Sequence, residues 1–442
     1  MRLKRKRLPR GPDCDGPDFV MRDEALQVLG VKASTLYSYV SRGLVQSLPV
    51  EGTKTRMFSR KDLENLRCRS EAHAGVAARA QGAMRFGEPI ISSQVTEIAA
   101  DGPHYRGYSA IELARAGRSF EAVSHLLWLG TLPPDDTRWD YQPARVAPDL
   151  LVNALQLPLP PRDVFKLFAA VILSLAPIES GTDMESGGSI PAAQQIIQTL
   201  AGCCGLLTPG GRCIDPRGRS VAATIAHALR PTDGDAAEAA INAALILCAD
   251  LELAPGTFAA RIAASAAADI HNCVVAGMAS HAGTLTSRGS EIAEELFLQG
   301  DRSSLQRKLD LIKQRGRQLY GFNHAMFPDG DPRAAAMIAI AKSIAPRSEQ
   351  AHDAFWLLDQ AATQCKAYPG VGIGLVVLAI ALGLPRRSAV ALWLIGRVAG
   401  QVAHVLEQRA QGFMLRPRAR YLPAHAATGE CGHALTGGRI IL

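Results

Sequence analysis

One histidine and three arginines stand in four short motifs in the second half of the chain. His324 closes Gly-Phe-Asn-His, Arg333 follows Asp-Pro, Arg397 lies within Gly-Arg-Val-Ala-Gly, and Arg416 opens Arg-Pro-Arg. A guanidinium presents a planar fork of N–H donors that matches the two oxygens of a carboxylate. A single arginine more often forms a surface ion pair than a ligand site, so residue type alone leaves both interpretations open.

A second kind of chemistry is indicated near the N-terminus, where the positive charge is concentrated. Residues 1–70 carry 15 Lys and Arg against 8 Asp and Glu, whereas the rest of the chain carries 33 of each. The formal net charge of +7 therefore belongs to this segment alone. A basic segment joined to a neutral body suggests two tasks, one of them contact with a polyanion. Residues 1–18 are expected to form a disordered basic arm, either a solvated tail or an arm that follows phosphates.

The rest of this segment has the pattern of a helix-turn-helix. Residues 22–28 predict a short helix, Gly30 supplies a turn, and a second helix opens at Ala33 with short polar side chains that suit a major groove. With the later Arg-Gly-Leu-Val and Arg-Met-Phe-Ser, residues 19–70 resemble a winged helix-turn-helix of the MerR/excisionase type. On that resemblance the candidate base or phosphate contacts are Ser34, Thr35, Tyr37 and Ser38. The candidate contacts to the DNA backbone are Arg42, Lys54, Arg56 and Arg60. The alternative is a small helical packing module.

The body that follows predicts a nearly all-helical structure. After an expected linker at 71–84, the chain is rich in Ala and Leu with helical periodicity, and strand signals are few, as at 88–91. Helices are expected at 120–129, 164–175, 236–248, 258–278, 305–319 and 388–411. Ala-rich helices approach one another closely, which suits a large packed bundle.

Cysteine usage and hydropathy indicate a cytoplasmic protein. The nine cysteines show no CxxC pair and no metal-ligand spacing, which is typical of reduced thiols, and no metal site is predicted. The Arg-rich N-terminus is not followed by the apolar segment of a signal peptide. The longest apolar run, 371–385, is too short and too rich in Gly to span a bilayer, so we expect no membrane partner.

Stretches of the body, taken together and in order, resemble the citrate synthase family. These stretches are 105–133, 257–265, 321–334 and 396–421. The resemblance spans roughly 85–425 and implies a mainly α, two-domain homodimer with its active site in the cleft between the domains. It implies a large domain formed by 85–280 and 378–442 and a small domain formed by 281–377.

The resemblance also implies roles for the residues of the first motifs. Family members condense acetyl-CoA with oxaloacetate, which needs a base for a methyl proton, a donor to the enol oxygen, and cations that hold the dicarboxylate. Arg333, Arg397 and Arg416 fall on the family's three arginines, one of which reaches across the dimer, and His324 falls on the ketone-binding histidine. No bound cofactor is implied; acetyl-CoA or another acyl-CoA would be a co-substrate.

The family's acid–base pair is replaced in this chain. Gly-Pro-Leu-His-Gly-Gly-Ala-Asn-Glu aligns without a gap on 283–291, which places Thr286 at the catalytic histidine. Tyr-Pro-Asn-Val-Asp aligns on 368–372, which places Gly372 at the catalytic aspartate. A second oxaloacetate-binding histidine becomes Leu251. The residues that could substitute from nearby are His281, Arg288, Asp329 and Asp331.

These observations support three hypotheses. The first is a metabolite-responsive regulator, a pseudoenzyme that binds an oxaloacetate- or citrate-like carboxylate and, through its helix-turn-helix, DNA. The alternative is a working citrate or 2-methylcitrate synthase that uses displaced residues and releases CoA. A third possibility is a subunit that pairs with an active synthase chain rather than with itself, so both homodimer and heteromer stay open.

Overall fold

The computed structural model describes most of the chain after the basic arm. The described residues are 19–41, 45–49, 55–60, 62–63, 91–134, 137–141, 143–144, 147–158, 163–176, 188–231, 234–283, 288–298, 302–314, 319–344 and 348–417. The chain divides into two compact units, Met1–Ser92 and Ser93–Leu442, each described here by itself. The predicted arm at 1–18 and linker at 71–84 lie outside the described residues.

The first unit combines two short helices with a small sheet. Its elements are β1 (Phe19–Met21), α1 (Arg22–Leu29), α2 (Ala33–Ser41), β2 (Ser47–Pro49) and β3 (Arg56–Ser59). The strands run antiparallel in the order β1-β3-β2. Gly30 ends α1 at φ 62°, a left-handed conformation that glycine adopts freely. A small core that includes Ala25, Leu36 and Phe58 joins helices and sheet. The helices expected at 22–28 and from Ala33 are present, while DNA binding stays a prediction.

The second unit, the body, is mainly helical and contains one three-stranded sheet in the order β4-β5-β6. Its elements are β4 (Thr96–Ala99), β5 (Gly102–Tyr105), β6 (Tyr108–Ser109), α5 (Ala110–Arg115), α6 (Phe120–Leu129), α7 (Pro148–Ala154), α8 (Val164–Leu175), α10 (Ser189–Cys203), η1 (Cys204–Leu207), α11 (Val221–Leu229), α12 (Gly234–Cys248), α13 (Pro255–Ser265), α14 (Ile270–His281), α15 (Arg288–Leu298), α16 (Arg302–Gln314), α17 (Pro332–Ile344), α18 (Glu349–Cys365), α19 (Val371–Ala381) and α20 (Ser388–Gln411).

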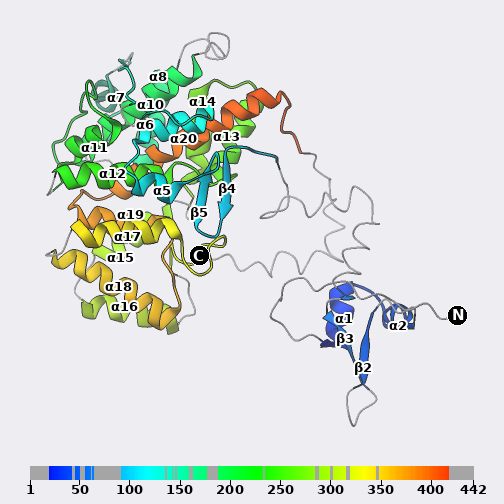
Figure 1. Ribbon diagram of the computed structural model, residues 1–442. Helices are drawn as coiled ribbons and strands as arrows, with labels where there is room; N and C mark the ends of the chain where they lie inside the picture. Colours follow the sequence, from blue (N-terminus) through cyan, green and yellow to red (C-terminus); the bar gives the residue numbers. More distant parts are fainter. Residues whose placement is uncertain are drawn as a thin grey trace. The chain divides into compact units, whose positions relative to one another are not determined.

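The helices of the body form two groups in Figure 1. Helices α15 to α19 lie together below the larger set that contains α6, α12, α13, α14 and α20. Helix α20 packs on helices of both groups, among them α12, α13 and α19. The predicted division into a large domain (85–280 and 378–442) and a small domain (281–377) stays a prediction.

The structure of the body differs from the sequence-based prediction at two places. The helix expected over 258–278 is divided into α13 and α14, because Ala267 adopts φ 61° and the Asp269 side chain accepts a hydrogen bond from the Asn272 N–H (3.0 Å) to begin a new helix. The hairpin of β4 and β5 was not anticipated, since its Gly and Pro residues obscure the alternation typical of a strand. The helices expected at 120–129, 164–175 and 388–411 coincide with α6, α8 and α20.

Helix α20 is the central helix of the body and carries a polar stripe. It has the length and apolar composition of a membrane span, as does the segment Ser189–Leu207, but 94% and 67% of the respective windows are buried, as in core helices of globular proteins. One face nevertheless presents Arg397, Gln401 and His404 at helical spacing, each 2% exposed or less. Buried polar groups require hydrogen-bond partners, so we next describe the residues around this stripe.

Candidate carboxylate-binding site

Arg397 is a buried cation whose hydrogen-bonding capacity is only partly used. Its side chain is 2% exposed, and its Nη1 lies 3.7 Å from Oδ1 of Asp250. Among the described residues its Nε and Nη1 have no hydrogen-bond partner. The guanidinium lies 5.2 Å from the centroid of the Trp393 ring, one turn earlier on α20. Burial lowers the pKa of Arg397 and the charge of Arg333 adds to this effect, although Asp250 opposes it.

Arg333 stands at the start of α17 in a fully buried ion pair. Its Nε donates to Oδ1 of Asp331 (3.0 Å) and its Nη2 donates to Oδ2 (2.7 Å), a bidentate arrangement. Asp331 also accepts from the Val371 N–H (3.1 Å), which fixes it against the start of α19. Burial alone would raise the pKa of Asp331, but the charge and hydrogen bonds of Arg333 lower it overall. Within the described residues, Nη1 of Arg333 stays without a partner.

His324 lies in a loop that two hydrogen bonds between Asn323 and Tyr368 hold in place. The Asn323 N–H donates to the Tyr368 carbonyl (2.8 Å), and the Tyr368 N–H donates to Oδ1 of Asn323 (2.8 Å). The Met326 N–H donates to Nδ1 of His324 (3.2 Å), so the proton of the neutral ring lies on Nε2. Burial and the charge of Arg333 lower the pKa of His324 below its usual 6.5. The ring is therefore neutral near pH 7 and can donate through Nε2.

We call the four predicted ligand-binding residues, His324, Arg333, Arg397 and Arg416, the clamp. The structure brings the first three of them together. The charges of both Arg333 and Arg397 act on His324, so the three groups share one electrostatic environment. Arg416 is different: it is exposed in the segment after α20, where the neighbouring Leu415 N–H donates to Oγ of Ser265 (3.0 Å). Among the described residues, Arg416 shares no hydrogen bond or ion pair with the other three.

The positions aligned with the acid–base pair contrast with this clamp. Gly372 is the second residue of α19, and a Cβ added there would lie 2.0 Å from Oγ of Ser290. Glycine offers no proton acceptor, and any side chain at 372 requires Ser290 to move. Thr286 lies outside the described residues, as does the side chain of Arg288.

The other residues considered as substitutes differ in their availability. Asp331 is committed to Arg333, and Asp329 is exposed. His281 is 2% exposed at the end of α14, with its ring perpendicular to that of Trp393 at 4.4 Å between centroids. Burial lowers the pKa of His281 to about 3, with a further contribution from Arg397. A neutral imidazole is therefore buried beside the clamp.

The contribution of Asp250 was missed by sequence reasoning. It is fully buried, contacts Arg397 and lies 3.2 Å from Nε2 of His404 through Oδ2. Burial alone would raise its pKa, but His404 and Arg397 lower it overall. Its position next to Leu251, inside a recognised motif, was the only signal in the sequence.

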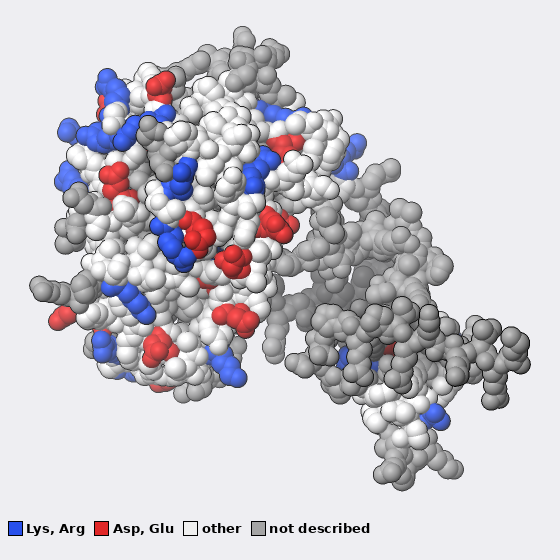
Figure 2. Space-filling model, viewed as in Figure 1, with Lys and Arg blue, Asp and Glu red and all other residues white. Residues whose placement is uncertain are grey.

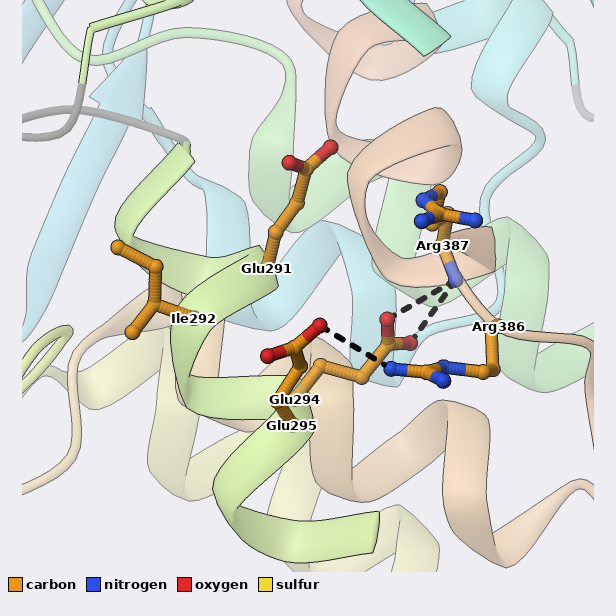
Figure 3. Close-up of a pocket in the computed structure, with 6 residues that line it drawn as sticks. All are labelled: Glu291, Ile292, Glu294, Glu295, Arg386 and Arg387. Carbon is orange, nitrogen blue, oxygen red and sulfur yellow. Dashed lines mark hydrogen bonds and ion pairs between the residues drawn. The ribbon is translucent and has the colours of Figure 1, made fainter. Parts of the chain in front are cut away.

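A separate pocket of about 180 Å³ opens between α15 and the start of α20 (Figure 3). Its polar walls are already paired: Glu294 accepts from the Arg387 N–H (3.0 Å) and Glu295 pairs with Arg386 (3.3 Å). With three glutamates among its lining residues and none of the clamp arginines, this pocket is poorly suited to a carboxylate ligand.

The predicted DNA contacts are only partly described. Tyr37 is 44% exposed on α2, with its ring edge against Phe58, and Thr35 and Ser38 are half-buried. Arg56 is exposed and donates to Oγ of Ser47 (3.0 Å), while Arg60 pairs with Glu24. The side chain of Ser34 and the whole of Arg42 and Lys54 lie outside the described residues.

The surface of the body fits its neutral composition. Figure 2 shows Lys and Arg interspersed with Asp and Glu over the visible face of the body, without a broad field of one sign. The basic character of the chain is thus confined to its N-terminal segment, which agrees with the charge count.

Comparisons with known proteins agree with the fold. The family model described as citrate synthase, C-terminal domain, matches residues 85–418. A 2-methylcitrate synthase of Shewanella oneidensis is 26% identical over 372 residues, covering 79% of this chain and 94% of the relative. A citrate synthase of Thermoplasma acidophilum is 25% identical over 341 residues, covering 72% and 88%. The structure of the Thermoplasma acidophilum citrate synthase in ternary complex with carboxymethyl coenzyme A and oxaloacetate superposes with a TM-score of 0.64 at 23% identity, covering 77% of this chain and 97% of that one.

Proposed function

Because the chain belongs to the citrate synthase family, we propose that it binds oxaloacetate or a closely related dicarboxylate and condenses it with acetyl-CoA or propionyl-CoA. The observation that carries the proposal is a pair of buried arginines, Arg333 and Arg397, beside a neutral His324; among the residues that the structure describes, each arginine has an N–H donor without a partner. The names of the relatives, citrate synthase and 2-methylcitrate synthase, supply the reaction class.

The clamp accounts for binding of the substrate. A ligand carboxylate between the free nitrogens of Arg397 and Arg333 would complete their hydrogen bonds and offset the cost of burying them. The Nε2–H of His324 would donate to the ketone oxygen and polarise its carbon. In the condensation, the acyl α-carbon gives up a proton and forms a bond to that carbon, and the ketone oxygen takes up a proton to become a hydroxyl. Water then cleaves the thioester to release a carboxylate and the CoA thiol.

The proton of the acyl α-carbon needs an acceptor, and Gly372 supplies none. A positioned general base is typically worth about 10²–10⁴-fold in rate. We therefore expect a turnover several orders of magnitude below that of a synthase that has both groups, with the dicarboxylate still bound.

Two measurements on the purified full chain test the proposal. Calorimetry with oxaloacetate and with citrate tests the clamp, and a thiol-release assay with acetyl-CoA and propionyl-CoA tests the reaction. Turnover that depends on oxaloacetate supports the proposal. Absence of binding at millimolar ligand would overturn both the proposed binding site and the proposed reaction. Binding without turnover would support the binding site and overturn the reaction.

A second candidate function is a dicarboxylate-responsive regulator that binds DNA. Two observations favour it: the +7 charge confined to residues 1–70 and the lack of a base at Gly372. Ligand binding in the body would change how two copies present Thr35 and Tyr37 to DNA. A gel-shift assay with promoter DNA, repeated with oxaloacetate and over a range of salt, tests this function. No salt-dependent shift would remove it.

The assembly bears on both candidates. We propose a homodimer in which Arg416, exposed in one chain, completes the clamp of the second chain. Light scattering of the purified protein tests for the dimer, and co-purification of a different synthase-like chain would instead favour a heteromer.

A further inference from the structure

A continuous chain of buried polar contacts starts at Arg397. Asp250 contacts Arg397 through Oδ1 (3.7 Å) and lies 3.2 Å from Nε2 of His404 through Oδ2. Nδ1 of His404 lies 3.0 Å from Nη1 of Arg261. Nη1 of Arg261 also donates to Oε2 of Glu407 (2.6 Å). The first four side chains are 2% exposed or less, and that of Glu407 is 13% exposed.

The chemistry of the groups fixes the direction of each hydrogen bond. A guanidinium can only donate, so Nδ1 of His404 accepts from Arg261. In the neutral ring the proton then lies on Nε2, which donates to Asp250. No bond in this series can reverse while Arg261 stays in place. Oδ2 of Asp250 accepts both from His404 and from the Glu252 N–H (3.1 Å), so a displacement of Asp250 changes the hydrogen bond that His404 donates.

The chain of contacts ends at the start of the body. The Gln94 N–H donates to Oε1 of Glu407 (2.7 Å), two residues after the boundary between the two units at Ser92. The strand that follows Gln94, β4, pairs with β5 through Thr96 and Tyr105. The Tyr105 hydroxyl accepts from the Asp250 N–H (3.2 Å) and donates to the Ile246 carbonyl (2.9 Å). Helices α13 and α20, which carry Arg261, His404 and Glu407, pack against each other, as Figure 1 also shows.

We infer that Asp250 and His404 are positioning residues for Arg397, and that Arg261 and Glu407 connect the occupancy of the carboxylate site to the backbone at Gln94. The inference rests on the proposed binding of a dicarboxylate. A ligand carboxylate on the free nitrogens of Arg397 competes with Asp250 for Nη1. Asp250 then moves toward His404, and the shift passes through Arg261 to Oε2 of Glu407, whose Oε1 accepts from the Gln94 N–H. To demonstrate such coupling, the behaviour of the backbone at Gln94 must be measured with and without a ligand at Arg397.

Hydrogen–deuterium exchange of the full chain measures this dependence. Oxaloacetate is the probe, and calorimetry on the same sample establishes that it is bound. In the wild-type protein, saturation should change the exchange rate of the amides at 93–96 by about fivefold or more, the lower end of typical coupling between sites. Binding without any change at these amides would overturn the inference and leave the proposed function intact. No binding would overturn both.

A conservative variant separates coupling from general stability. E407Q keeps the shape of the side chain but removes the charge that attracts Arg261, so the ligand-dependent change at 93–96 should be lost while oxaloacetate still binds. The matched control is E112Q, which removes an exposed glutamate paired with Arg115 and should keep the change. An E407Q protein that binds oxaloacetate and still shows the full change would contradict the inference.

Discussion

Two parts of the proposed site are built in different ways. On the carboxylate side, Arg333 and Arg397 are buried, and each retains a nitrogen without a partner in the described part of the chain. At the position aligned with the family's base, Gly372 lies close to Ser290 and its lack of a side chain leaves no group that can accept a proton. Holding buried cations is costly unless something completes their hydrogen bonds, whereas a glycine costs little to maintain. The proposed function therefore predicts that ligand binding and turnover are separable in this protein.

The largest effect is expected on the carboxylate side. R397Q removes the cation that pairs with Asp250 and that would bind the ligand carboxylate. The affinity for oxaloacetate should therefore fall at least a hundredfold, a loss of about 3 kcal/mol in binding free energy. R397K keeps the charge but loses the fork, and its loss should be smaller. Calorimetry measures both, with a thermal melt to establish folding. R386Q, at an exposed pair with Glu295, is the control. Unchanged affinity in folded R397Q would place the ligand elsewhere.

The rate of CoA release should respond to a carboxylate restored at position 372. G372D alone conflicts with Oγ of Ser290, so the double variant G372D/S290A is the appropriate test. Its rate of CoA release with acetyl-CoA and oxaloacetate should rise by at least about tenfold, a fraction of what a general base can contribute. G372N/S290A has the same shape without the carboxylate and should show no gain. Equal rates in the two double variants would show that residue 372 does not face the reacting atoms.

A smaller effect concerns the neutral imidazole beside Arg397. The pKa of His281 is lowered to about 3 from its usual 6.5, so the unfolded chain takes up this proton at a higher pH than the folded one. The contribution of His281 to stability is present above pH 6.5 and is lost as the pH falls toward 3, at about 1.4 kcal/mol per pH unit. Urea unfolding of H281Q at pH 7, 6 and 5 should therefore depend less on pH than that of the wild type. An unaltered pH dependence would show that His281 is not buried in its neutral form.

Local features of the sequence predicted much of the fold and part of the site. Residues 120–129, 164–175 and 388–411 form helices with the predicted ends, since their apolar periodicity is continuous and their boundaries carry turn residues. The break at Ala267 could not be read from an Ala-rich run that favours helix throughout. In the site, motif register gave His324, Arg333 and Arg397, but the role of Asp250 depends on the approach of α20 to the end of α12.

The sequence by itself determined the residue types: a basic segment before a neutral body, arginines in family register, and a glycine where a base would stand. Only the tertiary structure decided which charges are paired. It joined Asp331 to Arg333, left Arg416 exposed, and gave two nitrogens of Arg397 no hydrogen-bond partner within the described part of the chain. Pairing depends on distances and burial between segments far apart in the chain, and local propensity contains no information about them.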